Sequence, residues 1–147
     1  MGLSECASAL LLLSTGLMQT TTPKELVLVT GSSGLIGART ADRLSAEFRV
    51  AGLDRPGEPH PPSSVENIPC DLTSDDSVVQ ALTMVKGRFG SDIAAVVHLA
   101  AYFDFSGEPS SKYSEVTVEG TRRLLRALHT LGFRVARFIF SSTMLVH

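Results

Sequence analysis

The chain has 147 residues, with 13 Lys or Arg against 15 Asp or Glu and a formal net charge of −2. A chain of this length forms one domain and buries roughly two thirds of its unfolded surface, which is enough for a core. Without an excess of positive charge, nucleic acid and anionic membranes are not expected partners. Two cysteines, Cys6 and Cys70, are too few and too far apart for a disulfide framework or a metal site, so we expect a reducing, cytoplasmic location and no metal.

Residues 1–23 are predicted to form a flexible extension. An apolar stretch from Ala9 to Met18 has the length of a signal-peptide core but is too short for a membrane span. No Lys or Arg precedes it, whereas signal peptides begin with positive charge, so we favour an extension over a secretion signal. Met18 is an alternative start. The polar segment 19–23 then leads into a domain that we expect to cover 24–147.

The segment from Thr30 to Gly37, TGSSGLIG, is the most informative part of the chain, because it follows the strand-like run 26–29 and opens an amphipathic helix. A site for a dinucleotide pyrophosphate requires this order. Gly31 permits the tight turn, Gly34 removes a Cβ that would keep phosphates from backbone amides, and Gly37 lets helix and strand pack closely. The amides and the positive dipole end of the helix then face the anion. An ordinary glycine-rich turn is the alternative.

Asp54 ends a second strand-like run, 50–53, about 20 residues after the glycine turn. Its carboxylate can accept hydrogen bonds from the adenosine ribose hydroxyls and would repel a 2′-phosphate, which favours NAD over NADP. Arg55 opposes this preference, because a guanidinium beside the ribose could pair with that phosphate. We expect NAD, with NADP less favoured. As an alternative, Asp54 is a turn residue before Pro56.

The rest of the chain alternates between strand and helix patterns. The proline-rich segment 56–69 predicts a surface loop, 68–70 a short strand, the apolar run 93–101 a central strand and 138–142 a fifth strand. Three helices are predicted, with inward faces at Gly37, Ala41, Leu44 and Phe48; at Val78, Leu82, Val85 and Phe89; and, over 111–131, at Val118, Thr121, Leu125 and Leu128. Arg122, Arg123 and Arg126 are expected on a solvated surface. The alternation predicts an α/β fold with a Rossmann-type, doubly wound parallel sheet, truncated after the fifth strand, and ligands at the carboxyl ends of its strands.

Four segments, in order, resemble the extended short-chain dehydrogenase/reductases, also called the NAD-dependent epimerase/dehydratase family. They are the glycine turn, Asp71-Leu72, His98-Leu99-Ala100-Ala101 and the strand that ends at Thr143, and the resemblance covers 26–147. It implies that Asp71 binds the adenine amino group, that the amides of Leu35 and Ile36 bind the pyrophosphate, and that Thr143 is the catalytic hydroxyl. The cofactor-binding set implied in this way is Gly31, Ser33, Gly34, Leu35, Ile36, Gly37, Asp54, Asp71, Leu72, Leu99, Ala100, Ala101 and Thr117.

Taken singly, some of these residues also fit a purely structural role. Asp71 could belong to the polar start of the next helix, and His98 could be a hydrogen-bonded core residue. Thr117 stands where the family commonly has Asn in Asn-Val-x-Gly-Thr. The family's acid/base pair, Tyr followed four residues later by Lys, is absent, because Ser106 and Thr117 occupy that offset from the two tyrosines.

The resemblance implies the NAD-binding domain of an epimerase, dehydratase or related oxidoreductase that acts on a hydroxyl-bearing small molecule such as a nucleotide sugar. A ketone reductase like the 3β-hydroxysteroid dehydrogenases or dihydroflavonol reductases, and a non-catalytic dinucleotide-binding module, are the alternatives. Hydride transfer needs a group that takes the hydroxyl proton, so we expect no turnover from the 147-residue chain itself. We expect full-length relatives to be active enzymes, with a homodimer as one assembly.

Overall fold

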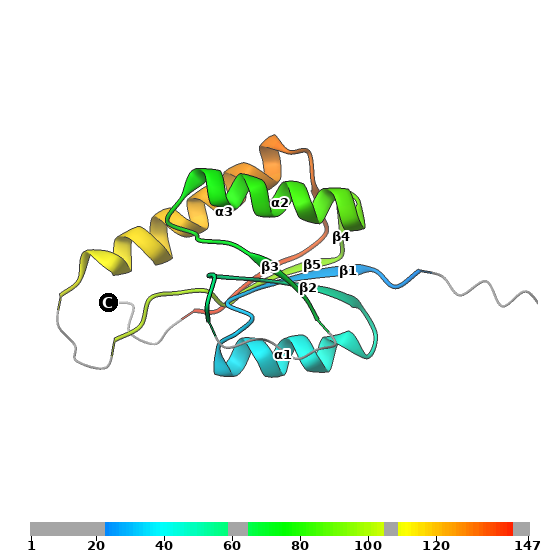
Figure 1. Cartoon of the computed structure of the whole chain (residues 1–147), viewed down its shortest axis with the longest axis horizontal. Coiled ribbons are helices and arrows are strands. Elements are labelled where there is room, and N and C mark those ends of the chain that lie inside the picture. Colours follow the sequence, from blue (N-terminus) through cyan, green and yellow to red (C-terminus); the bar gives the residue numbers. More distant parts are fainter. Residues whose placement is uncertain (1–22, 59–64, 105–108, 143–147) are drawn as a thin grey trace, which may run out of the picture.

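The computed structural model describes residues 23–58, 65–104 and 109–142. These residues build a five-stranded parallel sheet in the order β3-β2-β1-β5-β7 (Figure 1). Because the chain runs from β1 outward to β3 and then returns to β1's other side at β5, the order reverses between β1 and β5. The predicted doubly wound, Rossmann-type sheet is confirmed. Its strands are β1 (Leu26–Thr30), β2 (Arg49–Asp54), β3 (Glu66–Pro69), β5 (Ala95–His98) and β7 (Phe138–Phe140).

Helices cover both faces of the sheet. In Figure 1, α1 (Leu35–Ser45) lies on one face, while α2 (Asp75–Phe89) and α3 (Gly120–Thr130) lie on the other. A π-helix, η1 (Tyr113–Glu119), runs directly into α3. Two short strands, β4 (Asp92–Ile93) and β6 (Arg134–Val135), form a separate parallel pair. Within the described ranges, none of the helices combines the length and the apolar composition that crossing a bilayer requires.

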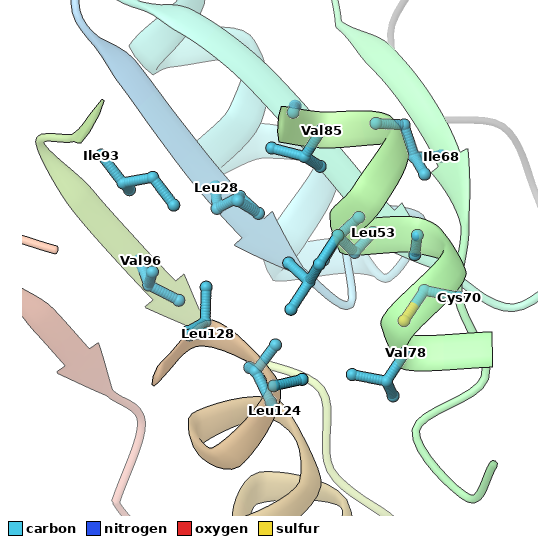
Figure 2. Close-up of a cluster of buried hydrophobic side chains, with 14 of the residues drawn as sticks. Leu28, Leu53, Ile68, Cys70, Val78, Val85, Ile93, Val96, Leu124 and Leu128 are labelled. Carbon is cyan, nitrogen blue, oxygen red and sulfur yellow. The ribbon is translucent and has the colours of Figure 1, made fainter. Parts of the chain in front are cut away.

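The core consists of two clusters, one on each side of the sheet. Strand β1 is buried throughout and alternates between them: Leu26 and Leu28 pack toward α2 and α3, whereas Val27 and Val29 pack toward α1. Figure 2 shows the larger cluster, where Leu28 and Leu124 of α3 point into the same space. This two-sided burial makes β1 the centre of the fold and holds its carboxyl end in place.

Helix α2 follows the sequence prediction closely. Ser74 is its N-cap and accepts a hydrogen bond from the Ser77 amide, and Asp75 and Asp76 place negative charge in the first turn, where the helix dipole favours it. The predicted inward residues Val78, Leu82 and Val85 are buried, with Phe89 packed against the same cluster.

The predicted inward face of the third helix is wrong in two positions. Val118 and Leu125 are 51% and 46% exposed. The buried residues of α3 are instead Gly120, Leu124, Ala127 and Leu128. The cause is η1, whose hydrogen bonds span one residue more than those of an α-helix, so that a regular helical period carried across 113–119 does not match the real face.

Other boundaries also differ from the prediction. The apolar run 93–101 is not one strand, because Ile93 belongs to β4 and pairs with β6, while Ala95–His98 forms β5. Strand β3 occupies the end of the predicted proline-rich loop. Arg122 and Arg126 are exposed as expected, but the Arg123 side chain is only 20% exposed and donates to the Leu72 carbonyl at 3.2 Å.

Ser32 gives a test of the packing beneath the glycine turn. Within the described ranges its hydroxyl is fully buried and has no hydrogen-bond partner. Removing a buried hydroxyl that bonds to nothing relieves a desolvation cost, so Ser32→Ala should leave the free energy of unfolding unchanged or raise it by up to about 1 kcal/mol. The matched control, Ser74→Ala, removes the α2 N-cap and should lower it by about 1 kcal/mol. Denaturant titration measures both. Equal losses in the two variants would show that the Ser32 hydroxyl is stabilising.

Candidate functional site

A cavity of about 680 Å³ opens where β1, β2, β3 and β5 end, at the point where the strand order reverses. Its size lies within the range of small-molecule sites, and its position is where ligands bind in open α/β sheets. Four loops line it, together with Lys112, which directly precedes η1, and Glu115 and Val116 of η1. The loop residues are Thr30, Gly31, Ser33 and Gly34; Leu53, Asp54, Arg55 and Glu58; 70–73; and 99–103.

Two glycines of the turn are required by backbone packing. Gly31 has a φ of +70°, and a Cβ there would lie 2.9 Å from the Ala100 amide nitrogen. A Cβ on Gly37 would lie 1.9 Å from the Gly31 carbonyl oxygen, a distance that no side chain can adopt. The close approach of helix to strand that was predicted for Gly37 is therefore present, and Gly31 also lets the loop after β5 lie against the turn.

Gly34 has a different environment. It is the N-cap residue of α1, it makes no side-chain cap, and a Cβ there would meet only the Gly31 carbonyl oxygen, at 3.3 Å. The first amides of α1 have no acceptor within the helix, since no preceding turn supplies one. Gly34 therefore keeps open the space in front of a helix N-terminus, where an anion is favoured.

The side chains of Leu35 and Ile36 point away from this space. They are 78% and 69% exposed and, together with Arg39 and Arg43, line a separate shallow depression on α1. Only their backbone amides can serve the cavity, which is the role predicted for them.

Asp54 connects the end of β2 to the glycine turn. One carboxylate oxygen accepts the Ser33 amide at 2.7 Å and the other accepts the Arg55 amide at 2.8 Å. Each oxygen keeps a further lone pair for a ligand hydroxyl. The Arg55 guanidinium forms an ion pair with Glu58 on the cavity lining, so its charge already has a carboxylate partner.

Asp71 and Cys70 form the floor after β3. One Asp71 carboxylate oxygen accepts the Thr73 amide at 2.9 Å and the Thr73 hydroxyl at 2.8 Å. The amide, followed by the hydroxyl, lowers the pKa of Asp71 below its usual 3.8, so this group is ionised at neutral pH. Burial, with the nearby charges of Asp71 and Asp54, raises the pKa of the Cys70 thiol to about 12, which keeps it neutral. Asp71 thus both lines the cavity and organises the approach to α2.

Residues 99–103, called the β5 wall below, close the cavity on the side of β5. Leu99, Ala100 and Ala101 are among its lining residues, as predicted. His98 directly precedes the β5 wall but is only 1% exposed and does not line the cavity. Its Nδ1 lies 2.7 Å from the Thr30 hydroxyl and its Nε2 lies 2.8 Å from the Thr121 hydroxyl. The structure thus places His98 as a hydrogen-bonded core residue.

Thr117 lies behind the cavity rather than on its lining. Its hydroxyl accepts the Tyr102 amide at 3.1 Å, so it contacts the β5 wall from outside. Thr143, the predicted catalytic hydroxyl, lies outside the described residues.

Several lining residues had not been singled out from the sequence: Glu58, Tyr102, Lys112, Glu115 and Val116. Lys112 lies over the Tyr102 ring, 5.5 Å from its centroid. Glu115 and Val116 are close in sequence to Thr117, a predicted cofactor-binding residue, and this proximity was the available indication that they lie at the site. The π-helix that turns them toward the cavity has no distinct sequence pattern.

The residues present fit a dinucleotide. The space left by Gly34, the uncapped N-terminus of α1 and the Asp54 carboxylate lie along one cavity, and these are the features that receive a pyrophosphate and a ribose. The model of the NAD dependent epimerase/dehydratase family matches residues 27–146.

The chain belongs to the NAD-dependent epimerase/dehydratase family. It is 33% identical over 121 residues to N-acetyl-alpha-D-glucosaminyl-diphospho-ditrans,octacis-undecaprenol 4-epimerase of Escherichia coli O157:H7, covering 82% of this chain and 33% of that protein. The chain therefore spans about a third of the length of this curated relative. Expected membership of this family is confirmed.

Solved structures of epimerases are also similar to this chain. A putative epimerase from Burkholderia cenocepacia J2315 is 33% identical with a TM-score of 0.66, covering 83% of this chain and 38% of that one. UDP-glucose 4-epimerase from Thermus thermophilus, in complex with NAD, is 30% identical with a TM-score of 0.65, covering 80% of this chain and 37% of that one.

The burial of His98 predicts a pH-dependent stability. Burial lowers the pKa of His98 from 6.5 to about 4, so the unfolded chain binds a proton more readily than the folded one. The stabilisation is complete above pH 6.5 and is lost as the pH falls toward 4, on the order of 3 kcal/mol over that window. Unfolding titrations at several pH values should show this slope, and His98→Gln, which cannot titrate, should flatten it. A wild-type profile as flat as the variant's would contradict the assignment.

Proposed function

We propose that this chain binds NAD in the cavity at the carboxyl ends of its strands, with the pyrophosphate at the N-terminus of α1 and the adenosine ribose on Asp54. The observation that carries this proposal is the contact between the Asp54 carboxylate and the Ser33 amide, which joins the acidic end of β2 to the glycine turn. The two features that a dinucleotide site needs are thus next to each other. Asp71 is the proposed acceptor for the adenine amino group.

A preference for NAD over NADP is supported by the charges on the cavity. Its lining carries four carboxylates, Asp54, Glu58, Asp71 and Glu115, against two cations, Arg55 and Lys112. Arg55 is paired with Glu58, so it is not held ready for a 2′-phosphate. An added phosphate dianion would meet excess negative charge.

For a full-length member of the family that includes this domain, we propose oxidation and re-reduction of a hydroxyl-bearing carbon on a sugar carried by a diphosphate. Support comes from the two relatives whose names specify a 4-epimerase of such compounds. NAD, when bound, accepts and returns the hydride. The residues described here bind and orient the dinucleotide, and Thr143 is proposed, from its place in the sequence, to hold the substrate hydroxyl.

Gly34→Val tests the pyrophosphate position. The backbone at Gly34 is extended, with a φ of −71°, and among the described residues the added Cβ comes within 4 Å of the Gly31 carbonyl oxygen alone, so the variant should fold. Its side chain would occupy the space in front of α1, and NAD affinity measured by calorimetry should fall about tenfold or more.

The matched control is Gly87→Val, because a Cβ on Gly87 in α2 meets no atom of the described residues within 4 Å, and Gly87 is not one of the cavity-lining residues. Its affinity for NAD should equal that of the wild type. Equal affinity in the folded Gly34→Val protein would show that the pyrophosphate binds elsewhere.

A second pair of variants tests the choice of cofactor. Asp54→Asn removes the charge while keeping an acceptor oxygen, and the preference for NAD over NADP should fall about tenfold. Glu58→Gln frees Arg55 from its ion pair and should strengthen NADP binding while leaving NAD binding unchanged. Titration of each variant with both dinucleotides gives the ratio. A wild-type preference for NADP would show that Arg55 dominates over Asp54.

A further inference from the structure

Two amides of the β5 wall, those of Ala100 and Tyr102, are linked by hydrogen bonds through four residues, of which only Thr30 lines the cavity among the described residues. The Ala100 amide donates to the Thr30 hydroxyl at 3.2 Å, and this hydroxyl contacts His98. On the far side of the ring, His98 contacts Thr121, whose hydroxyl donates to the Thr117 carbonyl at 2.6 Å. The Thr117 hydroxyl then accepts the Tyr102 amide. We call Thr30, His98, Thr121 and Thr117 the relay.

For a neutral imidazole, the hydrogen bonds of the relay determine which nitrogen of His98 carries the proton. A hydroxyl has a single proton, and Thr121 gives its proton to the Thr117 carbonyl, so it must accept from His98 Nε2. His98 therefore carries a proton on Nε2, and because burial lowers the pKa of His98 to about 4, its Nδ1 is bare at neutral pH and accepts from the Thr30 hydroxyl. Thr30 in turn has a lone pair for the Ala100 amide. The four contacts from Ala100 to the Thr117 carbonyl are thus satisfied by a neutral imidazole in the Nε2–H tautomer.

The relay joins the paired ends of β1 and β5, where the Leu99 amide donates to the Thr30 carbonyl at 3.2 Å, to the helical segment formed by η1 and α3. Thr30 ends β1, His98 ends β5, Thr117 lies in η1 and Thr121 lies in α3. The π-helix contributes directly, because the amide of Gly120 bonds to the Glu115 carbonyl five residues earlier. Thr117 thus presents its hydroxyl to Tyr102 and its carbonyl to Thr121 at the same time. Between Ala100 and Tyr102 stands the exposed, cavity-lining Ala101.

We propose that the relay positions the β5 wall, and that Thr117, which replaces the Asn common in this family, holds the Tyr102 end of that wall. This inference rests on the proposed binding of NAD in the same cavity, since the wall faces that ligand. Thr30, His98, Thr121 and Thr117 act as positioning residues: they place the amides of Ala100 and Tyr102, and through them the lining atoms between. A wall tied at both ends binds a ligand without first losing conformational freedom.

Variants of Thr117 in the 147-residue chain distinguish the effect of its hydroxyl group from the effect of its side-chain volume. Thr117→Val keeps the shape and removes the acceptor of the Tyr102 amide, so hydrogen exchange of that amide should become about tenfold faster. NAD affinity, measured by calorimetry, should fall about fivefold, the equivalent of one lost hydrogen bond. Thr117→Ser restores the hydroxyl and should keep both values near those of the wild type.

The imidazole nitrogen resonances of His98 report its tautomer directly in the wild-type protein, without a cofactor. The wild type should show the Nε2–H tautomer, and Thr121→Val, which removes the acceptor of that proton, should shift the His98 signals and also speed exchange of the Tyr102 amide. A wild-type Nδ1–H tautomer, or unchanged Tyr102 exchange in Thr117→Val, would overturn the relay. Failure of the wild type to bind NAD would instead contradict the proposed function, and the exchange and imidazole signals would still decide whether the relay exists.

Discussion

The contact between Gly37 and the Gly31 carbonyl is the constraint on which the rest of this molecule depends. A Cβ on Gly37 would stand 1.9 Å from that oxygen, so α1 can begin directly against the end of β1 only if Gly37 lacks a side chain, while the φ of +70° and the nearby Ala100 backbone require glycine at position 31. The Gly31 amide meanwhile donates to the Leu53 carbonyl at 2.9 Å, which ties the turn to β2, and Gly31 also packs against Ala100. One turn thus places the helix N-terminus, the end of β2 and the β5 wall around a single cavity. A side chain at either glycine would separate them.

Burial determines which titratable groups around this cavity are charged. Two buried titratable groups beside it are neutral at physiological pH, because burial raises the pKa of Cys70 to about 12 and lowers that of His98 to about 4. Asp71, which is less buried and accepts two hydrogen bonds from Thr73, has a lowered pKa and is charged. The buried groups are therefore uncharged, while the carboxylates on the cavity lining can accept hydrogen bonds from hydroxyl and amino groups of a ligand. This arrangement suits a ligand that is recognised at its ribose and base and held electrostatically only at its pyrophosphate.

The parts of the fold that follow from local sequence could be predicted. The strand, glycine turn and helix over 26–45 depend on neighbouring residues, and the position of Asp54 follows from the length of the first strand-helix-strand unit. The third helix could not be predicted in detail, because its buried face depends on η1, and a π-helix has no periodic signature of its own. Gly120 illustrates the difficulty: its Cβ would lie 3.0 Å from the Leu72 side chain, a contact between residues far apart in sequence.

Dependence on contacts between distant residues also explains why some site residues were not predicted from the sequence. Glu58 pairs with the Arg55 guanidinium, and Lys112 lies over the Tyr102 ring. These contacts form only in the folded chain, so the sequence did not single out either residue. Thr117 was found through its resemblance to a family position, yet its hydroxyl supports the β5 wall from behind. Sequence reasoning located the cavity from the motifs that form it. The side chains that support those motifs come from η1 and α3, whose packing is set by the whole core.

The most direct test of the dinucleotide site is to follow the backbone amide resonances of the isotopically labelled chain during titration with NAD. We expect saturable shifts at the start of α1, at Leu35 and Ile36, together with shifts at Asp54 and Asp71 and along the β5 wall. The exposed face of α2 should remain unaffected. Saturable binding whose shifts avoid the glycine turn and Asp54, or no binding at all, would contradict the central claim that these loops form a dinucleotide site.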